Sequence, residues 1–257
     1  VMGKIKGIAP ECIFMGNGSD EPIDLLIRAF CEPGIDEVMI FPPTYGMYKV
    51  AANINNVSVN EVLLTQDFQL DMTQIKSALN DHVKIIFICS PNNPTGNLIQ
   101  VQDIWDLATV FKGIIVIDEA YIDFTDTPSW IEVLSNFPHF VVLQTLSKAW
   151  GLASLRLGMA FCHPKIVDVL NLIKPPYNIS GPVQNHVLKA LKQEDQMRSF
   201  VEEIKELKKE LGSALDQLPI VLKVYPSEAN FFLVKFKEVQ EVFQYLIRNE
   251  IILRDRS

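Results

Sequence analysis

Short runs of apolar residues alternate with segments of helical periodicity along the first two thirds of the chain. Several runs are continuously apolar, which is typical of strands that are covered on both faces. The pattern predicts strands at 12–16, 37–41, 57–62, 84–90, 113–119, 140–145 and 158–162. Amphipathic segments between them predict helices at 19–30, 72–79, 102–111 and 165–173. This alternation predicts an α/β domain built on a mostly parallel seven-stranded sheet between helices.

The pattern changes at residues 174–182, where three prolines and one glycine interrupt the apolar runs. A long helix is predicted after this segment, from about Val183 to Leu215. Beyond it the pattern predicts strands at 221–225 and 230–236, a helix at 239–248 and a last strand at 251–255. We therefore expect a large domain over 1–176 and a smaller α+β domain over 177–257, joined by the long helix.

Composition narrows the class of protein. The chain has 257 residues, of which 48% are hydrophobic, so it can bury a large core. Its net charge is −8 without a basic patch, which argues against nucleic acid and anionic membranes as partners. No apolar run is long enough to cross a bilayer. Four widely separated cysteines without metal-ligand spacing predict a reduced, cytoplasmic protein without a metal site.

Polar and glycine-rich segments follow five of the predicted strands. Open α/β sheets bind ligands beyond the carboxyl ends of their strands, so these segments are where chemistry is expected. The segments are GNGSDEP (16–22), PPTYGMY (42–48), PNNPTG (91–96), DEAYIDF (118–124) and LSKAWG (146–151). We expect them to face one crevice.

The first of these segments combines a tight turn with the start of a helix. Gly16 and Gly18 permit the turn, and the free N–H groups of a helix that begins at Ser19 or Asp20 suit a phosphate. An ordinary N-cap at Ser19 explains the same residues. The spacing is neither that of a dinucleotide fingerprint nor that of a Walker A loop, which argues against NAD and ATP.

The fourth segment places a carboxylate after a very apolar strand. Asp118 follows the run IIVI, so its charge requires a partner, and a cationic ring nitrogen would be one. Tyr121, three residues later, offers a phenol on the same side of the turn. The alternative is that Asp118 caps a helix and Tyr121 packs in the core.

The fifth segment contains Lys148, a lysine at the end of a buried strand. A partly desolvated lysine has a lowered pKa and can form an imine with a carbonyl group. Pyridoxal phosphate requires such a lysine, a carboxylate for its ring nitrogen, a phosphate site and a stacking face. Ser147 and Arg156 suit the phosphate, Tyr45 suits the ring face, and Asn93 suits the ring oxygen.

These motifs resemble those of the fold-type I pyridoxal-phosphate aminotransferases. TLSKAWGLAS is similar to their lysine motif, and NNPTG and DEAY are similar to two further motifs in the usual order. RAFCEPG, PPTYGMY, SEANFFLVKF and NEIILRD extend the resemblance over nearly the whole chain, and it is closest to the members that act on histidinol phosphate. The resemblance implies the fold-type I architecture, with pyridoxal phosphate as the cofactor.

The resemblance also implies roles for individual residues. Lys148 carries the cofactor covalently and moves protons, Asp118 pairs with the ring nitrogen, and Tyr121 contacts the ring oxygen. The other residues implied to bind the cofactor are Ser19, Asp20, Tyr45, Asn93, Ser147 and Arg156. Arg254 is implied to help hold the phosphate of the substrate.

The activity implied is transamination between histidinol phosphate and 2-oxoglutarate or glutamate, a step of histidine biosynthesis. The alternatives are an aromatic amino acid aminotransferase, a threonine-phosphate decarboxylase or a non-catalytic regulator that senses the cofactor. The family's N-terminal arm, with a tyrosine for the partner subunit's site, and its C-terminal LRITVG segment have no counterpart here. We therefore expect that the working protein is longer at both ends and is a homodimer.

Overall fold

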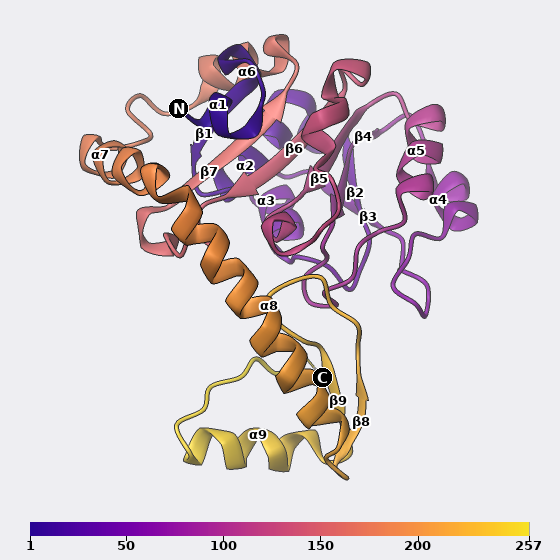
Figure 1. The fold of residues 1–257 in the computed structure, drawn as a ribbon. Coiled ribbons are helices and arrows are strands. Elements are labelled where there is room, and N and C mark those ends of the chain that lie inside the picture. The colour runs from indigo at the N-terminus through magenta and orange to yellow at the C-terminus, as the bar shows by residue number, and fades with distance from the viewer. Residues whose placement is uncertain (257) are drawn as a thin grey trace.

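The computed structural model describes residues 1–256, and its larger part is built on one seven-stranded sheet (Figure 1). The strand order is β1-β7-β6-β5-β4-β2-β3. The strands are β1 (Ile13–Asn17), β2 (Glu37–Ile40), β3 (Ser58–Glu61), β4 (Val83–Cys89), β5 (Ile114–Asp118), β6 (Phe140–Thr145) and β7 (Leu157–Cys162). Each lies within about one residue of its predicted position, so the predicted α/β class is confirmed.

Helices cover both faces of this sheet. One face carries α2 (Asp20–Phe30), α3 (Met47–Ile54) and α6 (Pro164–Ile173). The other carries α1 (Met2–Lys6), α4 (Met72–Ala78), α5 (Val101–Val110) and the 3₁₀ helix η3 (Trp130–Asn136). Neighbouring strand residues alternate between the two cores: Val116 packs with the first group and Ile117 with the second, as a pleated strand requires. The pattern did not predict α1 or α3.

The direction of β7 determines which loops meet at the site. β7 pairs antiparallel with both β6 and β1, whereas the pairs β6–β5, β5–β4, β4–β2 and β2–β3 are all parallel. The start of β7 therefore lies at the edge where the other strands end. Gly158 pairs with both Gly16 and Thr145 there, which places Arg156 beside the segment that opens α2.

The predicted long helix over 183–215 is two helices. α7 (Gly181–Ala190) and α8 (Glu194–Asp216) are separated by a 3₁₀ turn, Leu191–Gln193. The interruption allows Val187 and Leu191 to pack into the core of the large sheet, while α8 leaves in another direction (Figure 1). In the first half of α8, Val201 packs with Tyr121 and Phe124, next to the carboxyl edge of the sheet.

A small sheet follows α8. It consists of β8 (Val221–Val224) and β9 (Val234–Phe236), and α9 (Val239–Arg248) comes after it. The predicted strand at 251–255 is wrong, because this segment is exposed and has no ladder partner. Its three apolar residues, Ile251–Leu253, favour a strand locally, but a strand forms only where a neighbour supplies hydrogen bonds.

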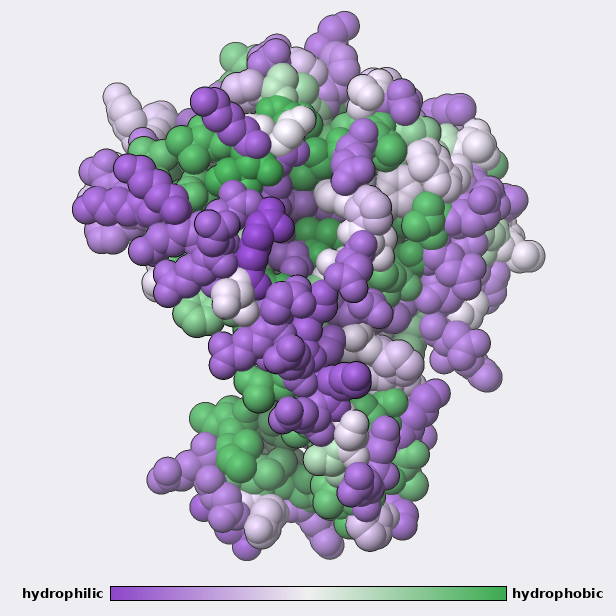
Figure 2. Space-filling model, in the orientation of Figure 1, coloured by the Kyte–Doolittle hydropathy of each residue, from purple (hydrophilic) through white to green (hydrophobic). Residues whose placement is uncertain are grey.

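Apolar side chains lie on the surface of this small part (Figure 2). Leu222 and Ile252 are two of the exposed ones, and the ring of Tyr245 is exposed as well. The division into domains at 176/177 stays a prediction. The last residue of the predicted second domain, Ser257, lies outside the described residues.

Within residues 1–256, no helix combines the length and apolar composition that crossing a bilayer requires.

Candidate active site

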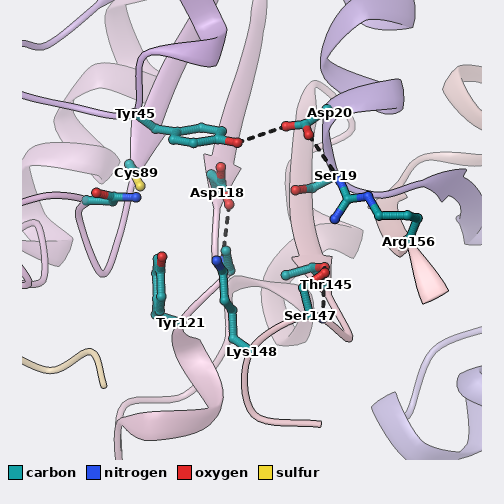
Figure 3. A pocket seen from close by; sticks show the side chains of 12 residues that line it. Ser19, Asp20, Tyr45, Cys89, Asp118, Tyr121, Thr145, Ser147, Lys148 and Arg156 are labelled. Carbon is teal, nitrogen blue, oxygen red and sulfur yellow. Dashed lines mark hydrogen bonds and ion pairs between the residues drawn. The ribbon is translucent and has the colours of Figure 1, made fainter. Parts of the chain in front are cut away.

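A pocket opens at the carboxyl edge of the large sheet (Figure 3). All nine residues predicted to bind the cofactor line it, and they come from six separate segments of the chain. Its lining consists of Ser19, Asp20, Tyr45, Cys89, Asn93, Asp118, Ala120, Tyr121, Thr145, Ser147, Lys148 and Arg156. Each of the five polar segments predicted to face one crevice therefore contributes residues to this pocket.

Asp118 forms the floor of the pocket. It is the last residue of β5 and only 2% exposed, with Cys89 opposite it on β4. Its Oδ1 accepts a hydrogen bond from the backbone N–H of Ala120 at 3.1 Å, and its Oδ2 accepts one from the hydroxyl of Tyr48 at 2.7 Å. Burial raises the pKa of Asp118 to about 6, against the lowering effect of these donors. A cationic partner in the pocket would stabilise its charged form.

Lys148 points into the pocket from the turn after β6, with its amine toward Asp118 (Figure 3). Its Nζ lies 5.2 Å from the centre of the Tyr121 ring. Lys148 is exposed as a whole residue, and the partial desolvation of its amine stays a prediction. The amine is therefore accessible to a ligand that enters the pocket.

Tyr121 forms one wall of the pocket. It is 7% exposed and meets Phe231 edge to face, at 5.1 Å between ring centres. Burial raises the pKa of Tyr121 to about 12, whereas a hydrogen bond from the Asn93 side chain lowers it. The phenol therefore keeps its proton near neutral pH, beside the Asn93 amide.

The opposite end of the pocket combines a helix start with a guanidinium group. Arg156 Nη2 lies 3.3 Å from Asp20 Oδ2 at the first turn of α2. Gly18 has φ +73°, and a Cβ on it would lie 2.5 Å from Arg156 Nη2. A Cβ on Gly158 would collide with the backbone of Gly18 and Ser19. Because these two glycines have no side chain, the backbone at the start of α2 and the Arg156 guanidinium can lie close together, an arrangement that suits a phosphate.

Two hydroxyl-bearing residues complete the phosphate end. The Thr145 hydroxyl donates to Ser147 Oγ at 2.9 Å, and the backbone N–H of Ser147 donates to Thr145 Oγ1 at 3.1 Å. This pair fixes the turn that leads to Lys148. The sequence prediction included Ser147 but not Thr145, which ends the apolar strand β6.

Tyr45 lines the pocket from the segment just before α3 (Figure 3). Its hydroxyl donates to Asp20 Oδ1 at 3.0 Å, which ties the aromatic ring to the phosphate end. Burial, followed by the charge of Asp20, raises the pKa of Tyr45. The ring is therefore held in place as a neutral surface against which a planar ligand can stack.

Arg254 is not part of the pocket lining. It is exposed in the segment after α9, but its charge lowers the pKa of Tyr121, so its guanidinium lies within electrostatic reach of the pocket. Its predicted contact with a substrate phosphate stays a prediction.

Three polar groups in or directly behind the pocket are not among the predicted site residues. Tyr48 lies behind Asp118 in the unpredicted helix α3, whereas Cys89 and Thr145 line the pocket at the ends of predicted strands. A usable signal existed for Cys89 and Thr145, because each ends a strand at the carboxyl edge. For Tyr48 the only signal was its spacing of one helical turn from Tyr45.

The pocket fits a phosphorylated pyridine cofactor in three respects. A buried carboxylate with a raised pKa faces an accessible lysine, the Tyr45 ring lines the same pocket, and glycines crowd a guanidinium against a helix start. Within residues 1–256, no cluster of three metal-binding side chains is present. Fold and pocket together define a class, the fold-type I enzymes that use pyridoxal phosphate.

Comparison with known proteins gives the same class. The model of the family "Aminotransferase class I and II" matches residues 3–257. A histidinol-phosphate aminotransferase of Cytophaga hutchinsonii is 50% identical over 256 residues, which are 100% of this chain and 74% of that protein. One of Parabacteroides distasonis is 48% identical over 98% of this chain and 73% of that protein. The chain belongs to the class I and II aminotransferases, a family of pyridoxal-phosphate-dependent enzymes.

Solved structures agree on the fold. A histidinol-phosphate aminotransferase from Clostridium acetobutylicum superposes with a TM-score of 0.90 at 24% identity, covering 98% of this chain and 76% of that one. One from Sinorhizobium meliloti in complex with pyridoxal-5'-phosphate gives 0.88 at 21% identity, covering 98% and 71%. At these identities the likeness concerns the architecture, which is that of a fold-type I aminotransferase.

Proposed function

We propose that this protein is a histidinol-phosphate aminotransferase that exchanges the amino group of histidinol phosphate with 2-oxoglutarate, in histidine biosynthesis. The observation that carries the proposal is the convergence of Asp118, Lys148 and Arg156 on one pocket. That pocket occurs in a chain 50% identical, over its full length, to a relative with this activity in its name.

The cofactor supplies an electron-withdrawing ring that weakens the Cα–H bond of the bound amino substrate. Asp118 would hold the proton of the ring nitrogen, because a buried carboxylate is stabilised by a positive partner at hydrogen-bond distance. The Lys148 amine would hold the cofactor covalently before substrate binds. Once released, the amine would carry a proton to and from the substrate Cα, a general acid–base role.

The remaining residues would orient the cofactor. Ser19, Ser147 and the Asp20 backbone would donate to its phosphate, and Arg156 would contribute charge. Asn93 and Tyr121 would donate to the ring oxygen, while Tyr45 would cover one ring face. Fixing the ring in this way keeps the Cα–H bond at a constant angle to it, which is the geometric part of the catalysis.

Three finer properties belong to the same proposal. Arg254, whose charge already reaches Tyr121, would hold the substrate phosphate at the open side of the pocket. The protein would form a homodimer, because the family resemblance implies a tyrosine supplied by a second subunit. The cytoplasm is the compartment proposed, since all four cysteines are free thiols.

A competition assay tests the substrate. The purified protein is loaded with pyridoxal phosphate and given histidinol phosphate, phenylalanine and threonine phosphate with 2-oxoglutarate, and its mass is measured in parallel. The proposal requires the highest kcat/KM for histidinol phosphate and a dimeric mass. A higher value for phenylalanine would make it an aromatic aminotransferase. Release of CO₂ from threonine phosphate would make it a decarboxylase, and cofactor binding without turnover would favour a regulator.

A further inference from the structure

The hydroxyl of Tyr48 reaches Asp118 from outside the pocket. Tyr48 lies in α3, is 0% exposed, and donates to Asp118 Oδ2 at 2.7 Å. The other carboxylate oxygen, Oδ1, accepts from the backbone N–H of Ala120 at 3.1 Å. Each oxygen of Asp118 therefore has one protein donor, and the two donors come from different elements. Two such contacts fix the plane of a carboxylate.

We propose that Tyr48 is a positioning residue of the transamination, whose hydroxyl orients the Asp118 carboxylate and keeps it ionised so that it can hold the proton of the cofactor's ring nitrogen. This inference rests on the proposed function. It deepens that function by assigning a role to a side chain outside the pocket lining. Tyr48 acts only through Asp118, because no part of it lines the pocket.

The surroundings of Tyr48 keep its hydroxyl in one place. Its ring stacks on Phe87 of β4, with ring centres 4.8 Å apart and planes 9° from parallel. It also meets Tyr45 edge to face at 5.5 Å. One turn of chain at the start of α3 thus carries Tyr45, which covers the pocket, and Tyr48, which supports its floor. A fully buried side chain packed on two rings has no room to turn its hydroxyl away.

The charges around Asp118 explain why a donor is needed. Besides burial, the charge of Asp20 raises the pKa of Asp118, whereas Lys148 and the Tyr48 hydrogen bond lower it. Burial raises the pKa of Tyr48 well above its usual value, and that of Cys89 as well. Both neighbours therefore remain protonated near neutral pH. Tyr48 is a permanent donor to Asp118, and Cys89 adds no negative charge.

The test is Tyr48→Phe in the holoenzyme, which removes one oxygen and keeps the ring. Because a hydrogen bond to a charged group contributes substantially to the stability of that charge, its loss should lower kcat about 10- to 100-fold. The KM for histidinol phosphate should change less than about twofold. A second measurement needs no substrate: the ¹⁵N chemical shift of ring-labelled cofactor. It should move toward the unprotonated ring nitrogen, because an Asp118 without its donor takes more of the shared proton.

Two control variants separate the hydroxyl from packing. Phe87→Leu removes the stacked ring but keeps the donor, so it should lower the melting temperature and leave the ¹⁵N shift in place. Tyr245→Phe removes a hydroxyl from an exposed tyrosine and should change nothing. An unchanged ¹⁵N shift in Tyr48→Phe overturns the inference, as does an equal shift in Phe87→Leu. If the parent protein binds the cofactor but does not turn over histidinol phosphate, the proposed function fails instead, and the ¹⁵N result still decides the role of Tyr48.

Discussion

Asp118 and Glu119 are consecutive buried carboxylates that serve different regions of the molecule. They are 2% and 1% exposed, and burial raises their pKa values to about 6 and about 7. Glu119 faces away from the pocket. Its Oε1 accepts from the backbone N–H of Trp130 at 2.7 Å, and its Oε2 accepts from Gln144 Nε2 at 2.8 Å and from the Ser129 hydroxyl.

The difference lies in what compensates each charge. Glu119 has three protein donors that join the start of η3 to β6, so its surroundings are complete without a ligand. Asp118 has two donors, and its remaining acceptor positions open into the pocket. Burial and a raised pKa are common to both residues. The unfilled acceptor capacity beside a lysine is what distinguishes a candidate catalytic carboxylate from a structural one.

The largest expected effect comes from the side chain that faces Asp118. Lys148→Ala should reduce transamination by about 10⁴-fold or more, because among residues 1–256 no other amine lines the pocket to move the Cα proton. The fold should survive, since Lys148 is exposed. Stopped-flow single turnovers and circular dichroism check the two halves of this prediction. Borohydride reduction of the parent followed by peptide mapping should label Lys148, and a label on another lysine would contradict the assignment.

Asp118→Asn should separate cofactor binding from chemistry. The amide keeps the shape of the carboxylate but cannot stabilise a protonated ring nitrogen, so Cα-proton removal should slow by about 10²- to 10⁴-fold. Cofactor affinity should fall far less, because Arg156 and the phosphate end are unchanged. Single-turnover kinetics with Cα-deuterated substrate measure the step. A near-parental rate would show that Asp118 does not hold this proton.

Glu119→Ala should lower stability and leave catalysis nearly unchanged, the opposite of what is expected for Asp118→Asn. It leaves the Trp130 N–H and the Gln144 amide without acceptors in the core, which should lower the free energy of unfolding by about 2–4 kcal/mol. The kcat per folded molecule should stay within about threefold, because Glu119 does not line the pocket. Urea unfolding and active-site titration measure the two quantities. A loss of kcat without a loss of stability would show that Glu119, like Asp118, serves catalysis.

The strands of the large sheet and the positions of Asp118 and Lys148 were within reach of the sequence, because the signals that predict them are local. β6 occupies its predicted range because Phe140–Thr145 is a continuous apolar run, and such runs become central strands wherever both faces are covered. Asp118 and Lys148 were found because they follow such runs. Their convergence on one edge then follows from the connectivity of a parallel sheet.

The features that the sequence did not predict depend on contacts with residues distant along the chain. The segment at 251–255 has strand-like composition but no ladder partner, and Gln193 interrupts a helical pattern so that Leu191 can pack in the core. Tyr48 has the ring of a core residue, and only the tertiary structure brings its hydroxyl to Asp118. Glu119 and Asp118 are indistinguishable in sequence, since the side chains that donate to them, Tyr48, Ser129 and Gln144, are distant along the chain.

The pH dependence of stability should also differ between the two carboxylates. Each has a folded pKa above its unfolded value, so its contribution to stability is present at low pH and is lost as the pH rises through the folded pKa. Between pH 5 and 7 the loss should be about 2 kcal/mol for Glu119 and about 1 kcal/mol for Asp118 in cofactor-free protein. Urea unfolding of Glu119→Gln and Asp118→Asn across this range should show flatter profiles than the parent. A variant profile parallel to the parent's would mean that the residue does not titrate there.

The smallest expected effect extends the comparison beyond the pocket lining, to Arg254. Its charge reaches Tyr121 from an exposed segment, so Arg254→Ala should raise KM for histidinol phosphate by about tenfold and leave kcat within about twofold. Arg254→Lys keeps the charge without the two-pronged geometry and should lie between parent and Ala variant. The absorbance of the bound cofactor should be the same in all three proteins, because the groups that hold the cofactor belong to the pocket around Asp118. A changed absorbance would instead assign Arg254 to the cofactor, and the substrate phosphate would then be bound by another group.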